Sequence, residues 1–189
     1  MSRRGIILFT ALFFSLVSFY GYALEFKGVI FEDRLTIGDT DCVLNGVGIR
    51  KKFFVEVYYG GLYLPQKTGD SRAVIEMDVP KAVVLKVVYK KVDAEKWREG
   101  WVEGFKKTAE SYGGDLKERI DRFVSFFDEP VVKGEEVRVV YVPNRGTEVI
   151  VKGRSKGVIP GSDFMKALWA IWFGEEPASE ELKKGMLGM

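Results

Sequence analysis

The sequence predicts an α+β fold, in which helices pack on a large antiparallel sheet. Strand-like runs follow one another through the first half of the chain, separated only by short turns. Two pairs of helical patterns come later, one after residue 93 and one after residue 162, with further strand-like runs between them. Consecutive strands with short turns are typical of antiparallel sheets. We see no internal repeat or linker, and expect one domain over residues 24–189.

The N-terminus has the pattern of a signal peptide. Arg3 and Arg4 precede an apolar run over residues 5–20, and Gly21-Tyr22-Ala23 places small residues before a cleavage site. We therefore predict a signal peptide over residues 1–23, with export to the periplasm or the extracellular space. An uncleaved membrane anchor is the alternative, although the run is shorter than the ~20 residues that a spanning helix needs.

Composition excludes several function classes. The chain has no histidine, which argues against Ser-His-Asp catalysis and His-zinc sites, and no phosphate-binding glycine loop is present. We predict no metal and no cofactor. The 29 basic residues balance the 27 acidic ones once Arg3 and Arg4 are removed, so no nucleic-acid partner is expected. Cys42 is the single cysteine; we interpret it as buried, with a reactive thiol as the alternative.

The first strands are short, and the next one is apolar on both faces. Residues 24–50 read as two or three short strands broken by Gly and Asp. The run Phe53–Leu64 is expected to be covered on both faces, or to line a cavity on one of them. We predict two further strands, at Ala73–Met77 and Ala82–Tyr89.

Amphipathic helices follow. Asp93 is the expected N-cap of a helix that ends at Gly113-Gly114; its stripe of Trp97, Trp101, Phe105, Thr108 and Tyr112 indicates core packing. A second helix runs from about residue 115 to residue 127. Three strands are expected over residues 135–159, with Pro143–Gly146 as a hairpin turn. The last two helices are expected to have Ser162 or Asp163 and Ser179 as their N-caps, and the first of them is apolar nearly all round.

Arg50 is the first candidate for a binding residue. It follows Gly46-x-Gly48, and an arginine there can present two parallel donors to a carboxylate, with Tyr58 as a further donor. The alternative is a charged surface turn over residues 49–52. Gly60-Gly61 is open to three readings: a bulge, close packing by the helix over residues 164–173, or the wall of an apolar tunnel.

The chain resembles the chalcone isomerase-like proteins of bacteria. The resemblance lies in L-x-G-x-G-x-R from Leu44, in F-x-x-V-Y-x-x-G-L-Y-L from Phe54, and in I-W-x-G-x-x-P-x-S-x-x-L-K-x-x-x-L-G from Ile171. The segment EKWREGWVEGF over residues 95–105 is also similar. The resemblance spans residues 44–188 and implies an open-faced β-sandwich, a large antiparallel sheet covered by a layer of helices.

The resemblance also implies roles for individual residues. Catalytic members use the arginine at this position with a threonine on the next strand; non-catalytic members bind fatty acids through the arginine and a tyrosine. Here Arg50 matches the arginine and Tyr58 takes the threonine position. Lys96 matches a catalytic lysine. The catalytic tyrosine, asparagine and late hydroxyl positions fall, in that order, on Asp93, Gly100 and Ile171.

Three hypotheses follow. The favoured one is a non-catalytic protein that binds a fatty acid or a similar apolar carboxylate. Arg50 and Tyr58 would hold the headgroup, and the tail would contact Phe54, Leu62, Leu168, Ile171 and Trp172. The second is an isomerase or intramolecular lyase that uses Arg50, Tyr58 and Lys96. The third is a structural or partner-binding protein of the cell envelope.

Overall fold

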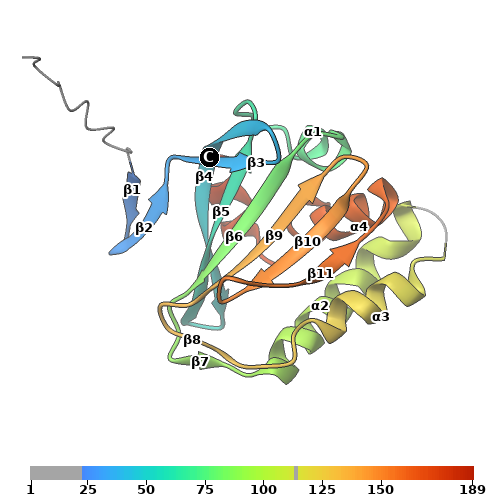
Figure 1. Ribbon diagram of the computed structural model, residues 1–189. Coiled ribbons are helices and arrows are strands. Elements are labelled where there is room, and N and C mark those ends of the chain that lie inside the picture. The colour runs from blue at the N-terminus through green and yellow to red at the C-terminus, as the bar shows by residue number, and fades with distance from the viewer. Residues whose placement is uncertain (1–22, 113–114) are drawn as a thin grey trace, which may run out of the picture.

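A seven-stranded antiparallel sheet forms the centre of the molecule (Figure 1). The computed structural model describes residues 23–112 and 115–189, so the predicted signal peptide up to residue 22 and the predicted helix stop at Gly113-Gly114 lie outside the described residues. The strand order is β11-β10-β9-β6-β5-β4-β3. The strands are β3 (Arg34–Ile37), β4 (Thr40–Lys52), β5 (Val55–Leu64), β6 (Lys81–Val87), β9 (Glu136–Val142), β10 (Gly146–Val151) and β11 (Arg154–Ile159).

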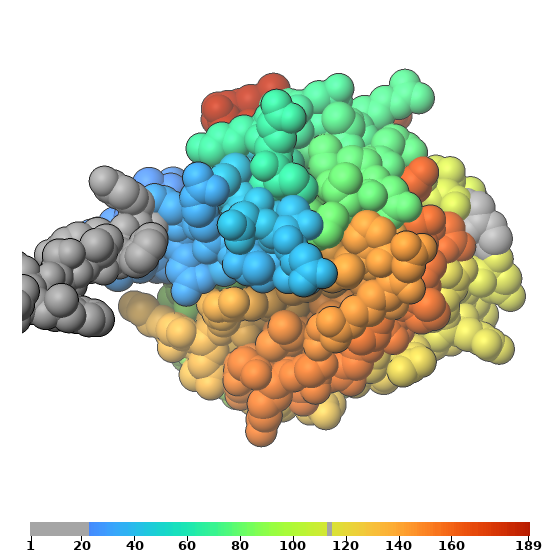
Figure 2. Space-filling view, turned by 45° about the horizontal axis from the view of Figure 1, so that its top comes forward, coloured from blue at the N-terminus to red at the C-terminus, as the bar shows by residue number. Residues whose placement is uncertain are grey.

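The sheet is curled, and its second face carries a small core of its own. Strand β3 contacts β9, although three strands separate them in the sheet order, and Figure 2 shows the corresponding blue and orange segments side by side. The hairpin β1 (Ala23–Phe26) and β2 (Val29–Glu32) pairs with itself and places Phe31 in this core. Cys42 is buried there, as expected, and burial raises the pKa of its thiol to about 11.

Five α-helices accompany the sheet in the part of the chain that the structure describes, which confirms the α+β fold with a helical layer. They are α1 (Ser71–Glu76), α2 (Ala94–Thr108), α3 (Lys117–Ser125), α4 (Ser162–Phe173) and α5 (Glu180–Met186), with a 3-10 turn, η1, over Ala109–Tyr112. Helix α4 is the central one, since it contacts both α1 and α2 and buries nearly every side chain. No helix of the described residues is long and apolar enough to cross a membrane.

Some local predictions were wrong. The N-cap of α4 is Gly161 and neither Ser162 nor Asp163. Residues 73–77 form no strand; they belong to helix α1 and its C-cap, and the Asp70 carboxylate accepts hydrogen bonds from the backbone N–H groups of Arg72 and Ala73. This N-cap outweighs the strand preference of the short apolar run. Residues 49–52 form no turn either, since β4 continues to Lys52 and the turn lies at Phe53-Phe54.

Glycines let α5 lie directly on the sheet. A Cβ atom at Gly48 would stand 2.1 Å from the Leu182 carbonyl oxygen, and one at Gly46 would stand 2.3 Å from that of Gly185. A Cβ at Gly60 would likewise meet Leu182, while one at Gly61 would meet the Phe31 ring on the other face. Gly60 and Gly61 are therefore positions of close packing and form neither a bulge nor the wall of a tunnel. The helix that packs on Gly60 is α5 and not the expected α4.

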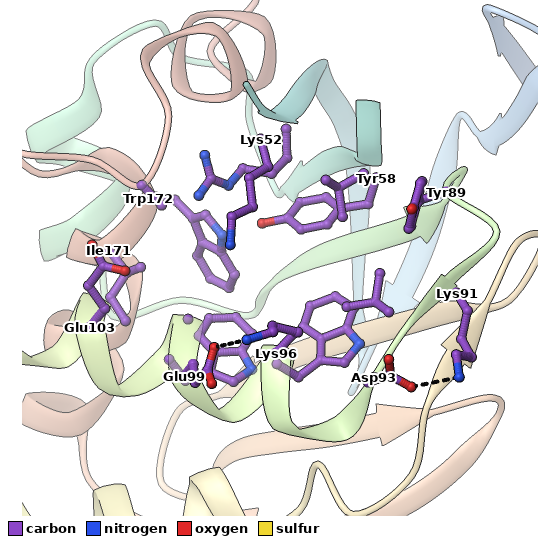
Figure 3. Close-up of a pocket in the computed structure, with 17 residues that line it drawn as sticks. Lys52, Tyr58, Tyr89, Lys91, Asp93, Lys96, Glu99, Glu103, Ile171 and Trp172 are labelled. Atoms are coloured by element: carbon purple, nitrogen blue, oxygen red, sulfur yellow. Dashed lines mark hydrogen bonds and ion pairs between the residues drawn. The ribbon is translucent and has the colours of Figure 1, made fainter. Parts of the chain in front are cut away.

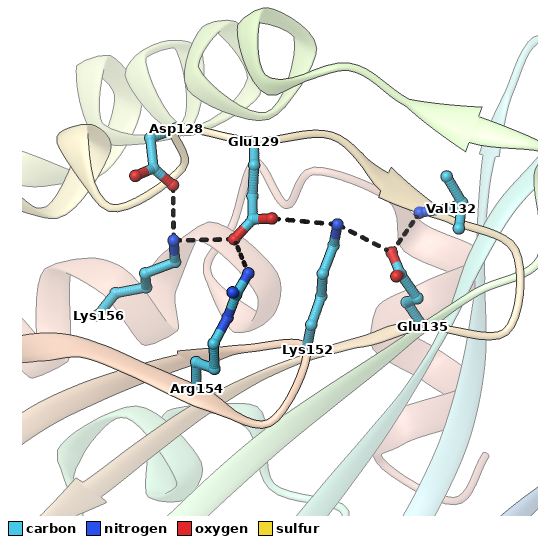
Figure 4. Close-up of polar contacts among 7 residues, drawn as sticks. All are labelled: Asp128, Glu129, Val132, Glu135, Lys152, Arg154 and Lys156. Atoms are coloured by element: carbon cyan, nitrogen blue, oxygen red, sulfur yellow. Dashed lines mark hydrogen bonds and ion pairs between the residues drawn. The ribbon is translucent and has the colours of Figure 1, made fainter.

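A cluster of ion pairs fastens the segment after α3 to the last hairpin (Figure 4). The Glu129 carboxylate contacts the amino groups of Lys152 and Lys156 and the guanidinium of Arg154. These contacts, led by the hydrogen bond from Lys156, lower the pKa of Glu129 to about 2. The two-residue strands β7 (Lys91–Val92) and β8 (Val131–Val132) pair at the neighbouring end of the sheet.

Candidate functional site: a cavity between the sheet and α2

A cavity of about 380 Å³ lies where β4 and β5 pass under α2 and the end of α4 (Figure 3). Its walls combine aromatic side chains with charged groups at the rim. The lining residues that carry the argument are Arg50, Tyr58, Trp97, Trp101, Ile171 and Trp172.

The sheet register explains why Arg50 reaches this cavity. Gly46, Gly48 and Arg50 alternate along β4, so all three point to the face that bears the helices. Helix α5 covers the two glycines, with Leu182 over Gly48 and Gly185 over Gly46. The helix begins at Glu180, and Arg50 lies just beyond that end. The glycines thus seat the helix, and the arginine extends past it into open space.

Arg50 has few partners in the protein. Its Nη1 donates to the Lys51 carbonyl oxygen at 3.0 Å. Within residues 23–112 and 115–189, no carboxylate forms an ion pair with its guanidinium. A partly buried guanidinium without a counter-ion retains most of its capacity to bind an anion, and its planar donor pair suits a carboxylate.

Tyr58 lies directly opposite Arg50 in the β4–β5 ladder. Its ring stacks on Trp97 with the ring centroids 5.7 Å apart, and only 9% of the residue is exposed. Burial raises the pKa of the Tyr58 hydroxyl, and the nearby positive charge of Arg50 opposes that shift. The hydroxyl therefore stays protonated at neutral pH and can donate a hydrogen bond beside the arginine.

Three tryptophans form the apolar wall. Trp97 and Trp101 stack at 6.3 Å, and Trp172 meets Trp101 edge-on at 5.5 Å. The indole N–H groups of Trp97 and Trp101 are buried and find no acceptor among the described residues. Buried indoles usually have a hydrogen-bond partner. Both nitrogens have almost no exposed surface, so the wall that faces the cavity consists of aromatic carbon atoms.

The charges at the rim are mostly paired with one another. The Lys96 amino group contacts the Glu99 carboxylate at 2.7 Å, and Lys91 contacts Asp93 at 2.9 Å (Figure 3). The hydrogen bond to Glu99 raises the pKa of Lys96, so its ammonium holds its proton more firmly than a free lysine does. This arrangement makes Lys96 a poor proton donor at neutral pH.

The fold has counterparts among known proteins. A family model described as chalcone isomerase-like matches residues 23–188. The chain belongs to the chalcone isomerase-like family. Among solved structures, it is similar to the Arabidopsis thaliana fatty-acid binding protein, with a TM-score of 0.73 and 20% sequence identity over 88% of this chain and 96% of that one. No curated protein is significantly similar to this sequence.

The structure brings together five of the eight residues named from the sequence. Arg50, Tyr58, Lys96, Ile171 and Trp172 all line the cavity. Asp93 and Gly100 line it too; these are the positions where the resemblance to this family places a tyrosine and an asparagine in catalytic members.

The other three residues lie elsewhere. Phe54 is 99% exposed, because it belongs to the turn before β5. Leu62 and Leu168 are completely buried in the core between the sheet and α4, and neither lines the cavity. Leu62 shares a face with Tyr58, but it lies four residues further along β5, beneath the covering helices.

Sequence reasoning named Lys96 on α2 but missed Trp97 and Trp101 as cavity residues. These two were interpreted only as core packing, and they do pack in the core. They also border the cavity. The two large aromatic side chains in the stripe were the available signal, since aromatic side chains commonly line ligand pockets.

Proposed function

We propose that this protein binds a fatty acid or a similar apolar carboxylate and does not catalyse a reaction. The observation that carries the proposal is Arg50, whose guanidinium has no carboxylate partner among the described residues. It lies at the edge of an aromatic cavity, beside the protonated hydroxyl of Tyr58. The carboxylate would accept from both groups, and the chain would lie against Trp97, Trp101 and Trp172. The fatty-acid binding of the similar Arabidopsis thaliana protein supports the same reading.

Comparison of an acid with its methyl ester tests the proposal directly. Three of the four tryptophans line the cavity, so palmitate binding should change the intrinsic fluorescence. We expect wild type to prefer palmitate over methyl palmitate, and Arg50→Met to lose this preference. The expected loss of palmitate affinity is about 10- to 100-fold, because a hydrogen bond to a charged group contributes roughly 1.5–3 kcal/mol.

Lys51→Met is the matched control. Lys51 follows Arg50 in the chain but pairs with Glu181 and does not line the cavity. We expect it to bind palmitate like wild type, since exposed ion pairs contribute little to stability. Equal palmitate affinity of Arg50→Met and wild type would contradict the proposal.

The cavity offers little support for an isomerase. Asp93 and Gly100 supply no tyrosine or amide donor, and Lys96 is tied to Glu99. Incubation with naringenin chalcone should therefore give the spontaneous rate of cyclisation. A cavity beside Tyr58 also goes against a purely structural role, which would leave that space filled.

Export is part of the proposal. It depends on the basic and apolar pattern of residues 1–23, which indicates a cleaved signal. Expression of the full chain in a bacterium, followed by N-terminal sequencing of the periplasmic fraction, should give a mature protein that begins at Leu24. Retention of the full-length chain in the membrane fraction would favour the uncleaved anchor.

A further inference from the structure

The tip of the β4–β5 hairpin exposes two aromatic side chains. Phe53 is 87% exposed and Phe54 is 99% exposed, more than any other large apolar side chain of the described residues. Val55, the next residue, is also about half exposed. Single exposed apolar residues are common, but three adjacent ones at the end of a hairpin form a patch that water solvates poorly.

The backbone at this tip is unfavourable for the residue that occupies it. Lys52 pairs with Val55, so Phe53 and Phe54 form a two-residue turn, and Phe53 has a φ angle of 55°. Such turns normally place glycine or asparagine at a positive φ, because a bulky side chain is strained there. Neither packing nor turn geometry therefore favours phenylalanine at residue 53.

A second tip lies beside the first. The backbone N–H groups of Val88 and Tyr89 both donate to the Val57 carbonyl oxygen, which holds the segment leading into β7 against β5. Figure 1 shows β7 and β8 at the same end of the molecule as the β4–β5 turn. Tyr89, just before β7, and Val132 of β8 are each 38% exposed, so they extend the apolar patch.

Basic residues surround the apolar patch. Lys52, Lys90, Lys91 and Lys133 are all exposed and belong to the two tips. Within the described residues, only Lys91 of these four forms an ion pair, with Asp93. The whole protein is nearly neutral, so this positive charge is a local property of the tips. We call Phe53, Phe54, Val55, Tyr89 and Val132, with these four lysines, the tip surface.

The tip surface is continuous with the mouth of the cavity. Lys52, Tyr89 and Lys91 belong to the tip surface and also line the cavity (Figure 3). A binding partner that covers the tip surface would therefore also face the opening of the cavity. Aromatic side chains beside lysines are the combination that enters the interfacial region of a bilayer, with the rings at headgroup level and the ammonium groups on anionic lipids.

We propose that the tip surface docks on an anionic lipid bilayer. Phe53 and Phe54 enter the headgroup region, the lysines meet lipid phosphates, and the cavity mouth faces the membrane. A protein partner fits these features less well, since an aromatic tip flanked by lysines offers no shaped surface for a folded partner. The docking itself does not depend on the proposed function; only its use, the transfer of an apolar carboxylate between bilayer and cavity, rests on that proposal.

Flotation with vesicles tests this docking. The chain from Leu24 is mixed with vesicles of phosphatidylcholine alone or of phosphatidylcholine with phosphatidylglycerol. We expect wild type to float with the anionic vesicles, and less so at high salt, because screening weakens the lysine contacts. The double variant Phe53→Ser/Phe54→Ser should lose at least about tenfold in partitioning, since it removes both apolar side chains that enter the headgroup region.

Two further variants keep the test interpretable. Met189→Ser removes an apolar side chain that is 77% exposed, at the opposite end of β4, and should float like wild type (Figure 1). Phe53→Gly relieves the positive φ, so its melting temperature should rise while its flotation falls. That opposite movement separates lost docking from a damaged fold.

Three outcomes would overturn the proposal: wild type that binds no vesicles, a double variant that floats like wild type, or equal flotation with neutral and anionic vesicles. Arg50→Met should float normally, and the double variant should bind palmitate in solution. Failure of docking and failure of ligand binding are therefore separate results.

Discussion

The two ends of the helix-covered face of the sheet differ in how tightly they are closed. At one end, α5 lies backbone against backbone on Gly46 and Gly48, with Leu182 filling the space over Gly60. At the other end, two residues further along the same strands, Arg50 and Tyr58 border a cavity of about 380 Å³. The first residue of α5 thus decides which part of β4 and β5 is covered by a helix and which part borders the cavity.

The basic residues at the two ends of this face also differ in how many hydrogen-bond partners they have. Lys81, at the closed end, is completely buried, and its amino group donates to the carbonyl oxygens of Val74 and Met77 at 2.6 and 2.9 Å. Arg50 donates to one neighbouring carbonyl oxygen and is partly exposed to the cavity. Lys81 is saturated by the end of helix α1, whereas Arg50 has donors left for a ligand. A cation without a carboxylate becomes a binding site only where space remains beside it.

The largest effect should come from filling the closed end. Gly48→Ala would place a methyl group against the Leu182 carbonyl, and because backbone cannot give way, α5 must shift. We expect a loss of about 3 kcal/mol in the free energy of unfolding, at the upper end for overpacking. Urea denaturation measures it.

Gly100→Ala is the matched control for that loss. A Cβ atom at Gly100 meets no other atom within 4 Å, and the residue lies inside helix α2. This substitution should stabilise the protein by up to about 1 kcal/mol, the difference in helix propensity. Equal stability of the Gly48 and Gly100 variants would refute the close contact of α5 with β4.

A pH-dependent effect should appear at Lys81. Burial lowers its pKa to about 7, from 10.5 in an exposed lysine. Between pH 7 and pH 9 the unfolded chain therefore keeps a proton that the folded one releases, so stability should rise with pH, by up to about 1.4 kcal/mol per pH unit. The chain has no histidine to mask this slope. Urea denaturation across this range should show the rise in wild type, and a Lys81→Met variant with an unchanged slope would count against it.

The smallest effect should come from Tyr58→Phe at the open end. The ring keeps its stacking on Trp97, and only the hydroxyl donor beside Arg50 is lost. We expect palmitate to bind about fivefold more weakly, because a hydrogen bond contributes about 1 kcal/mol. Titration calorimetry of this variant beside Arg50→Met would rank the two donors. A larger loss for Tyr58→Phe would make the hydroxyl, and not the guanidinium, the main anion contact.

Prediction succeeded where local pattern decides structure. The helix stripe that includes Trp97, the turn at Pro143–Gly146 and the strand Arg154–Ile159 all follow from periodicity or turn chemistry, and the structure confirms them. Ser179 caps α5 as expected, since its side chain accepts from the Leu182 N–H group. The prediction that Phe53 and Phe54 belong to a strand was wrong, because aromatic residues favour strands. Only the pairing of Lys52 with Val55 makes the two residues a turn.

By itself, the sequence determined the α+β class, because periodicity is a local property of a chain. Its family motifs, rather than glycine spacing, pointed to Arg50 and Tyr58 as the candidate ligand contacts. Only the tertiary structure decided that Gly46 and Gly48 seat α5, that Leu62 and Leu168 lie in the core, and that Trp97 and Trp101 border the cavity. Those outcomes depend on which distant segment covers each position, and here the start of one seven-residue helix sets the boundary between packed core and open site.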